Sequence, residues 1–172
     1  RLVNGSWKVL QTLSGGKVSS ADFSSATNGY VLHADGSLVR TTTGGVTWSR
    51  VDAGTPSAPR LVMTPDDDTV LLFGSFGVYR ATGGGSFSKV AGPNGRGLWT
   101  AGHAGKRVGY VTNTGQRKNR QFLLSANGGR NWRTVAWPKS LPARITYLTV
   151  LPGKGLLATA EGKLYRSADD RG

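Results

Sequence analysis

Short apolar runs of four or five residues recur along the chain, and Gly, Pro, Asp or Asn residues bound them. Residues 29–33 (GYVLH), 69–73 (TVLLF) and 107–111 (RVGYV) are examples. Runs of this length between turn residues are typical of β-strands, and no segment sustains the 3.6-residue apolar period of a helix. The pattern therefore predicts an all-β fold of short antiparallel strands.

The runs are grouped in an internal repeat that is closed each time by an aromatic residue. The separations between these aromatic residues are 41, 39 and 45 positions, for Trp7, Trp48, Phe87 and Trp132. Four strands in about 40 to 45 residues are typical of one blade of a β-propeller. A β-sandwich also repeats its strands every 8 to 12 residues or so, but it does not require the same turn to return in the same phase.

We therefore predict a β-propeller of four-stranded antiparallel blades, with four blades in this chain. The predicted blades cover residues 11–51, 58–90, 96–135 and 143–172, and residues 1–10 add an N-terminal strand. Glycine accounts for 26 of the 172 residues, about twice the usual share, as expected of a chain with many turns.

One turn sequence returns in two of the repeats. Residues 41–48 (TTTGGVTW) and 125–132 (SANGGRNW) share the spacing Ser/Thr-x-Asp/Asn-x-Gly-x-Thr/Asn-Trp, with Thr43 in the Asp position of the first copy. In such a turn a short polar side chain accepts backbone N–H groups, glycine supplies a positive φ, and the Trp indole N–H needs a partner. We expect the following turn residues to be structural: Thr41, Thr43, Gly45, Thr47, Trp48, Ser125, Asn127, Gly129, Asn131, Trp132, and Ser167 and Asp169 of an incomplete last copy.

This motif resembles the Asp-box, or bacterial neuraminidase repeat. The wider phrase, with Asn28-Gly-Tyr30 followed by residues 36–42 (GSLVRTT), is similar to the blades of photosystem II assembly-factor and sialidase-like propellers. The resemblance implies a periplasmic or secreted location and a larger propeller of six or more blades, of which this chain would supply four. An alternative also stays open, in which the N-terminal strand closes a four-bladed ring.

Charge adds a candidate binding surface. The chain has 22 Lys and Arg against 9 Asp and Glu, a formal net charge of +13, and no acidic residue occurs in the 92 positions from 69 to 160. Arginine binds carboxylate, sulfate or phosphate through two parallel hydrogen bonds. We select as candidate anion- or partner-binding residues Lys106, Arg107, Arg117, Lys118, Arg120, Arg130 and Arg133. The alternative is that the basic residues are spread along strand edges, which they protect from pairing with other sheets.

An anionic protein, an acidic polysaccharide or an envelope polymer would fit this charge. Nucleic acid stays open as a partner, but the basic loop lacks interleaved aromatic residues and no nucleic-acid motif is present. No apolar run approaches the roughly 20 residues of a membrane-spanning helix. The absence of cysteine excludes disulfides, thiol nucleophiles and Cys-based metal sites.

Few residues are candidates for acid–base chemistry. The chain has one glutamate, Glu161, and two histidines, His33 and His103. Asp22, on a predicted inner strand, is a candidate carboxylate, but glycoside hydrolysis needs two carboxylates about 5 to 9.5 Å apart. The acidic run at 66–68 lacks the spacing of a calcium loop.

We therefore predict a non-catalytic binding or assembly scaffold without a metal or cofactor. Two alternatives stay open. In the first, the chain is a fragment of a secreted glycoside hydrolase of sialidase or xyloglucanase type. In the second, it is a structural subunit of an extracellular assembly.

Overall fold

The computed structural model describes most of the chain. It covers residues 2–3, 6–7, 9, 11–14, 16–52, 54, 59–74, 77–91, 98–112, 121–137, 139–142 and 145–167, with the backbone alone at 2–3, 6–7, 98–99 and 154. The described residues contain no α-helix. No helix among them is long and apolar enough to cross a membrane.

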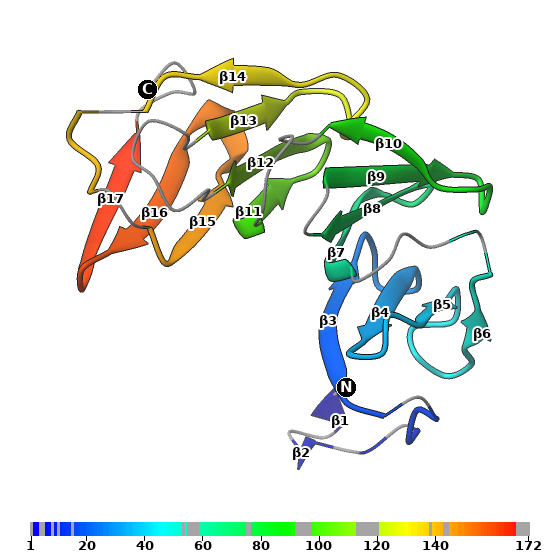
Figure 1. Ribbon diagram of the computed structural model, residues 1–172. Coiled ribbons are helices and arrows are strands. Elements are labelled where there is room, and N and C mark those ends of the chain that lie inside the picture. Colours follow the sequence, from blue (N-terminus) through cyan, green and yellow to red (C-terminus); the bar gives the residue numbers. More distant parts are fainter. Residues whose placement is uncertain are drawn as a thin grey trace.

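The strands form successive antiparallel sheets that follow the order of the chain (Figure 1). The first two sheets contain β3 (Val18–Phe23), β4 (Gly29–His33), β5 (Leu38–Thr41) and β6 (Ser49–Arg50), then β7 (Pro59–Asp66), β8 (Thr69–Gly74), β9 (Gly77–Thr82) and β10 (Ser88–Ala91). The third and fourth contain β11 (Leu98–Ala104), β12 (Arg107–Thr112), β13 (Gln121–Ser125) and β14 (Arg133–Val135), then β15 (Tyr147–Val150), β16 (Leu156–Ala160) and β17 (Lys163–Ser167). A short hairpin of β1 (Leu2–Val3) and β2 (Ser6–Trp7) precedes them, and a 3₁₀ turn, η2 (Pro152–Lys154), links β15 to β16.

The sheets are arranged side by side along an open arc. The first strand of each sheet lies towards the concave side of the arc, and β14, β10 and β6 lie on the outside (Figure 1). Successive inner strands are in contact, β3 with β7, β7 with β11, and β11 with β15. Residues from three or four different sheets can therefore meet at the centre.

Three apolar cores lie between neighbouring sheets. Strand β8 contributes to two of them, which explains its run of apolar residues. Every residue of β8 is buried. Leu72 packs with Leu32 of the first sheet, whereas Leu71 packs with Val108 of the third. Because both faces of this sheet are covered, alternate residues enter different cores and neither face can be polar.

Candidate functional site

The first matching turn, between β5 and β6, is organised by short hydrogen bonds. The Gly45 N–H donates to Thr41 Oγ1 at 2.9 Å, and the Thr47 N–H donates to Thr43 Oγ1 at 2.8 Å. The Trp48 indole N–H donates to the Gly45 carbonyl at 3.0 Å. Thr43 thus supplies the acceptor oxygen at the position where the motif has Asp or Asn.

The second matching turn, between β13 and β14, repeats this bonding. The Gly129 N–H donates to Ser125 Oγ at 2.9 Å, the Asn131 N–H donates to Asn127 Oδ1 at 2.9 Å, and the Trp132 indole N–H donates to the Gly129 carbonyl at 2.9 Å. These polar atoms are engaged inside the turn, so a structural role is sufficient for them.

The incomplete last copy begins at Ser167, where β17 ends. Its third residue, Asp169, lies outside the described residues. A shorter, degenerate copy follows β9, where Gly83 and Gly84 have positive φ values of 59° and 74° and Phe87 stands in place of Trp.

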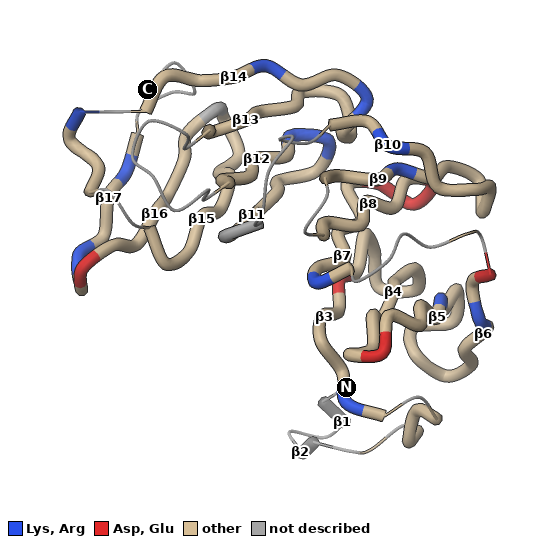
Figure 2. Tube along the Cα trace, viewed as in Figure 1, with Lys and Arg blue, Asp and Glu red and all other residues tan. Residues whose placement is uncertain are grey.

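The structure separates the basic candidates. Arg117, Lys118 and Arg120 lie outside the described residues. Arg107, at the start of β12, is half-buried and donates to the Leu151 carbonyl at 3.3 Å, beside the fourth sheet. Arg133 is exposed on the outer strand β14. Figure 2 shows basic positions along the edge of the arc that contains β10, β14 and the start of β12.

Lys106 and Arg130 line one cleft at the rim between the second and third sheets. The cleft has a volume of about 630 Å³ and also contains the acidic turn at 66–68 and Arg80 of β9. The Lys106 Nζ lies 3.6 Å from Asp66 Oδ2. Arg80 donates through Nε to the Gly128 carbonyl at 3.0 Å.

The acidic run at 66–68 is visible in the sequence, but its position beside Lys106 was not predicted. Burial tends to raise the pKa of Asp66, but hydrogen bonds from Thr69 and Asp68 and the charge of Lys106 outweigh it, and the pKa is lowered. Asp66 is therefore ionised at neutral pH. The cleft therefore contains both signs of charge, whereas Arg133 is exposed on the outer strand β14.

Asp22, the candidate carboxylate of β3, joins three sheets at the centre of the arc. Its Oδ2 accepts hydrogen bonds from the Thr64 N–H at 2.6 Å and from Thr64 Oγ1 at 2.8 Å, both on β7. The same oxygen accepts a hydrogen bond from His103 Nε2 of β11 at 2.9 Å. The side chains of His103 and Asp22 are 18% and 24% exposed.

Asp22 and His103 shift each other's pKa. Burial opposes the ionised form of Asp22, but the hydrogen bonds from His103 and Thr64 outweigh it and lower the pKa. The hydrogen bond to Asp22 raises the pKa of His103 against the opposing effect of burial. The arrangement favours a His⁺–Asp⁻ pair that ties the inner strands together.

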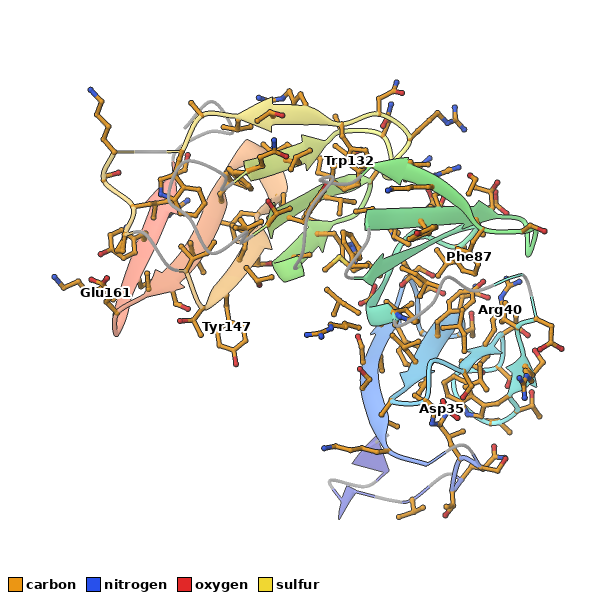
Figure 3. The ribbon with its side chains drawn as sticks, viewed as in Figure 1. Asp35, Arg40, Phe87, Trp132, Tyr147 and Glu161 are labelled. Carbon is orange, nitrogen blue, oxygen red and sulfur yellow. The ribbon has the colours of Figure 1, made fainter. Side chains whose placement is uncertain are left out.

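The other catalytic candidates do not join this pair. Glu161 is exposed in the turn between β16 and β17, at the far end of the fourth sheet (Figure 3), and His33 of β4 is fully buried. Among the described residues, no three His, Asp or Glu side chains are placed to hold a metal ion.

Comparison with solved structures identifies the fold. YCF48 from Cyanidioschyzon merolae is 17% identical with a TM-score of 0.65, over 95% of this chain and 56% of that chain. The GH74 xyloglucanase from Xanthomonas campestris is 15% identical with a TM-score of 0.67, over 89% of this chain and 28% of that chain. The chain is a β-propeller. This confirms the predicted fold class, and the four sheets, β3–β6, β7–β10, β11–β14 and β15–β17, are hereafter blades 1 to 4.

A third propeller with this fold is PorZ, a bacterial surface component of the type-IX secretion system of Porphyromonas gingivalis. It is 17% identical with a TM-score of 0.59, over 91% of this chain and 21% of that chain. The chain thus spans about half of YCF48 and less than a third of the other two. No protein-family model matches the sequence, and no curated protein does.

Proposed function

We propose that this propeller is a non-catalytic binding or assembly scaffold with a basic face for an anionic partner. The bonding of Asp22 carries the first part of the proposal. Its Oδ2 accepts three hydrogen bonds that join blade 1 to blades 2 and 3, so a structural role accounts for this partly buried carboxylate. A glycosidase also needs a second carboxylate about 5 to 9.5 Å away, whereas the partner beside Asp22 is a histidine.

The basic face is supported by charge and exposure. It consists of the seven basic candidates, of which Arg130 and Arg133 are exposed and the Lys106 side chain is 66% exposed. No acidic residue occurs from position 69 to 160, and among the basic candidates Lys106 lies beside an acidic residue, Asp66 of blade 2. An acidic protein, an acidic polysaccharide or an envelope polymer has the complementary charge. Placement outside the cytoplasm is supported by the likeness to PorZ, a surface component.

We also infer that the two matching turns are Asp-boxes. The support is the shared set of three bonds in each turn, from Gly45 and Gly129, from the residue before the Trp, and from the Trp indole. In this interpretation the turns hold the outer strand of the blade, and the binding surface is built from the residues around them.

Retention on heparin, a polyanion, tests the basic face. We expect the triple variant with Arg117→Glu, Lys118→Glu and Arg120→Glu to elute from a heparin column at much lower salt than the wild type. Each lost cation removes one anion contact, and each contact contributes to the salt dependence of binding. The measurement is the salt concentration at elution.

A matched control separates local contacts from total charge. The variant with Arg60→Glu, Lys163→Glu and Arg166→Glu has the same net charge, but the changed residues are exposed positions outside the basic face. The control should elute close to the wild type. Equal elution of the two triple variants would show that total charge alone determines retention and would refute the basic face.

A further inference from the structure

Arg40 of β5 is a half-buried cation whose Nε has no hydrogen-bond acceptor in the part of the chain that the structure describes. Its guanidinium carbon lies 5.6 Å from the centroid of the Tyr30 ring, which stands directly opposite on β4. Among the described residues, none accepts a hydrogen bond from its buried Nε, and no carboxylate forms an ion pair with it. Buried donors without an acceptor are unfavourable and rare in native proteins, so the hydrogen-bonding capacity of this guanidinium is not filled by the described residues.

The guanidinium lies in a cleft between blades 1 and 2. The cleft has a volume of about 400 Å³, and its lining combines polar residues with the apolar side chains of Tyr30, Val70, Ala81 and Phe87. Figure 3 shows Arg40 and Phe87 on the two sides of this junction. A cleft of this size and lining suits a small organic ligand with an apolar body and one polar group.

The next junction shows what Arg40 lacks. There Arg80 extends from blade 2 to the turn of blade 3 and donates through Nε to the Gly128 carbonyl at 3.0 Å. Arg40 extends in the same way towards the turn of blade 2, where its Nη1 lies 4.0 Å from the position that a Cβ on Gly84 would occupy. That turn is the shorter, degenerate copy, and it leaves the Arg40 Nε without an acceptor.

The charges around the cleft limit the ligand to a single negative charge. The second cation of the lining, Arg50, is paired with Asp52 at 2.8 Å. Burial raises the pKa of Tyr30, so its phenol is neutral at neutral pH. Arg40 therefore adds one positive charge to the cleft. The carboxylates of Asp52 and of Asp68, whose charge acts on Tyr30, would repel a second negative charge.

We propose that this cleft binds a small monocarboxylate with an apolar body. The planar guanidinium matches a carboxylate in a two-bond pairing, for which its terminal Nη groups would be the donors. The apolar side chains of the lining would cover the body of the ligand. The site lies apart from the basic face and does not depend on the proposed function.

Titration with 3-phenylpropionate, followed by the amide NMR signals of Gly84, Gly85 and Ser86, tests the proposal. These signals should shift saturably with the acid and stay unchanged with the neutral amide 3-phenylpropanamide. Inorganic phosphate at the same ionic strength should not reproduce the shifts. Equal shifts with the acid and the amide, or stronger shifts with phosphate, would overturn the proposal.

Two substitutions place the binding at Arg40. Arg40→Gln should weaken 3-phenylpropionate binding about tenfold or more, because charged hydrogen bonds are lost. Ser86→Asp, at an exposed lining residue, should block binding by supplying a carboxylate within the cleft while Arg40 is retained. Arg166→Gln, at an exposed position of β17, is the matched control and should bind like the wild type. Unchanged affinity in both cleft variants would contradict the site.

Discussion

A single hydroxyl oxygen organises each of the two matching turns. Ser125 Oγ accepts the N–H groups of Gly129 and Asn127 at 2.9 and 3.3 Å, and Thr41 Oγ1 accepts those of Gly45 and Thr43 at 2.9 and 3.2 Å. Because a local sequence spacing specifies these bonds, the sequence was sufficient to predict that the side chains would bind their own turn. Only the structure shows which oxygen accepts the hydrogen bond from the glycine N–H of each turn.

Removal of this hydroxyl should destabilise the propeller. In Ser125→Ala the buried Gly129 N–H loses its acceptor, and we expect the free energy of unfolding to fall by about 1 to 3 kcal/mol. Urea denaturation measures the change. Ser140→Ala, at an exposed position, is the control and should have little effect. Equal stability of the two variants would show that the hydroxyl does not hold the turn.

At the scale of strands, the periodic apolar runs were a sufficient signal for the fold because each strand forms from neighbours in sequence. Both β8 and β12 read as continuous apolar runs, and both are middle strands with covered faces. The contacts between blades gave no comparable signal. Gly102 of β11 looks like any turn-forming glycine in the sequence, yet it lies inside a strand with the backbone of β15 against it.

Gly102 should accept no side chain. A Cβ at this position would overlap the Leu148 carbonyl oxygen and lie 2.5 Å from the Thr149 Cα. Gly102→Ala should push β15 away and lower the free energy of unfolding by about 1 to 3 kcal/mol, as overpacking does. Hydrogen exchange should also accelerate at the Leu148 amide, which donates to Thr100 Oγ1 at 3.1 Å.

Gly105→Ala provides the comparison for this substitution. Gly105 has a positive φ of 54° with no atom within 4 Å of an added Cβ. Its replacement introduces backbone strain in the turn between β11 and β12 but no clash with β15. Protection of the Leu148 amide should therefore be unchanged in this variant, and a loss of protection there would mean that the effect is not one of packing between blades.

At the scale of the whole molecule, sequence reasoning found the residues of the centre but not their pairing. Asp22 and His103 are 81 positions apart, on the inner strands of blades 1 and 3. Whether the two side chains meet depends on the angle between successive blades around the common centre. No local sequence pattern specifies this angle. The same holds for Arg40, because the absence of an acceptor is set by the shape of a turn in the next blade.

The hydrogen bond between Asp22 and His103 should make the free energy of unfolding depend on pH over a range that can be predicted. Because the pKa of His103 is raised in the folded protein, its protonation contributes fully to the free energy of unfolding below the ordinary pKa of 6.5. This contribution is lost as the pH rises through the pKa that His103 has in the folded protein. The lowered pKa of Asp22 gives stability that is complete above its ordinary value of 3.8 and is lost as the pH falls through the folded value. The contribution of the pair is therefore largest between about pH 4 and 6.5.

His103→Gln isolates this contribution, because glutamine retains a neutral donor but does not titrate. We expect the wild type to exceed the variant in free energy of unfolding by about 1 to 3 kcal/mol near pH 5.5, since a hydrogen bond between charged groups is replaced by a weaker one. The difference should shrink as the pH rises above the ordinary pKa of histidine. Urea denaturation from pH 4 to 9 measures both curves. Parallel curves across this range would show that His103 is not protonated against Asp22 in the folded protein, and the centre would then be held by the Thr64 bonds alone.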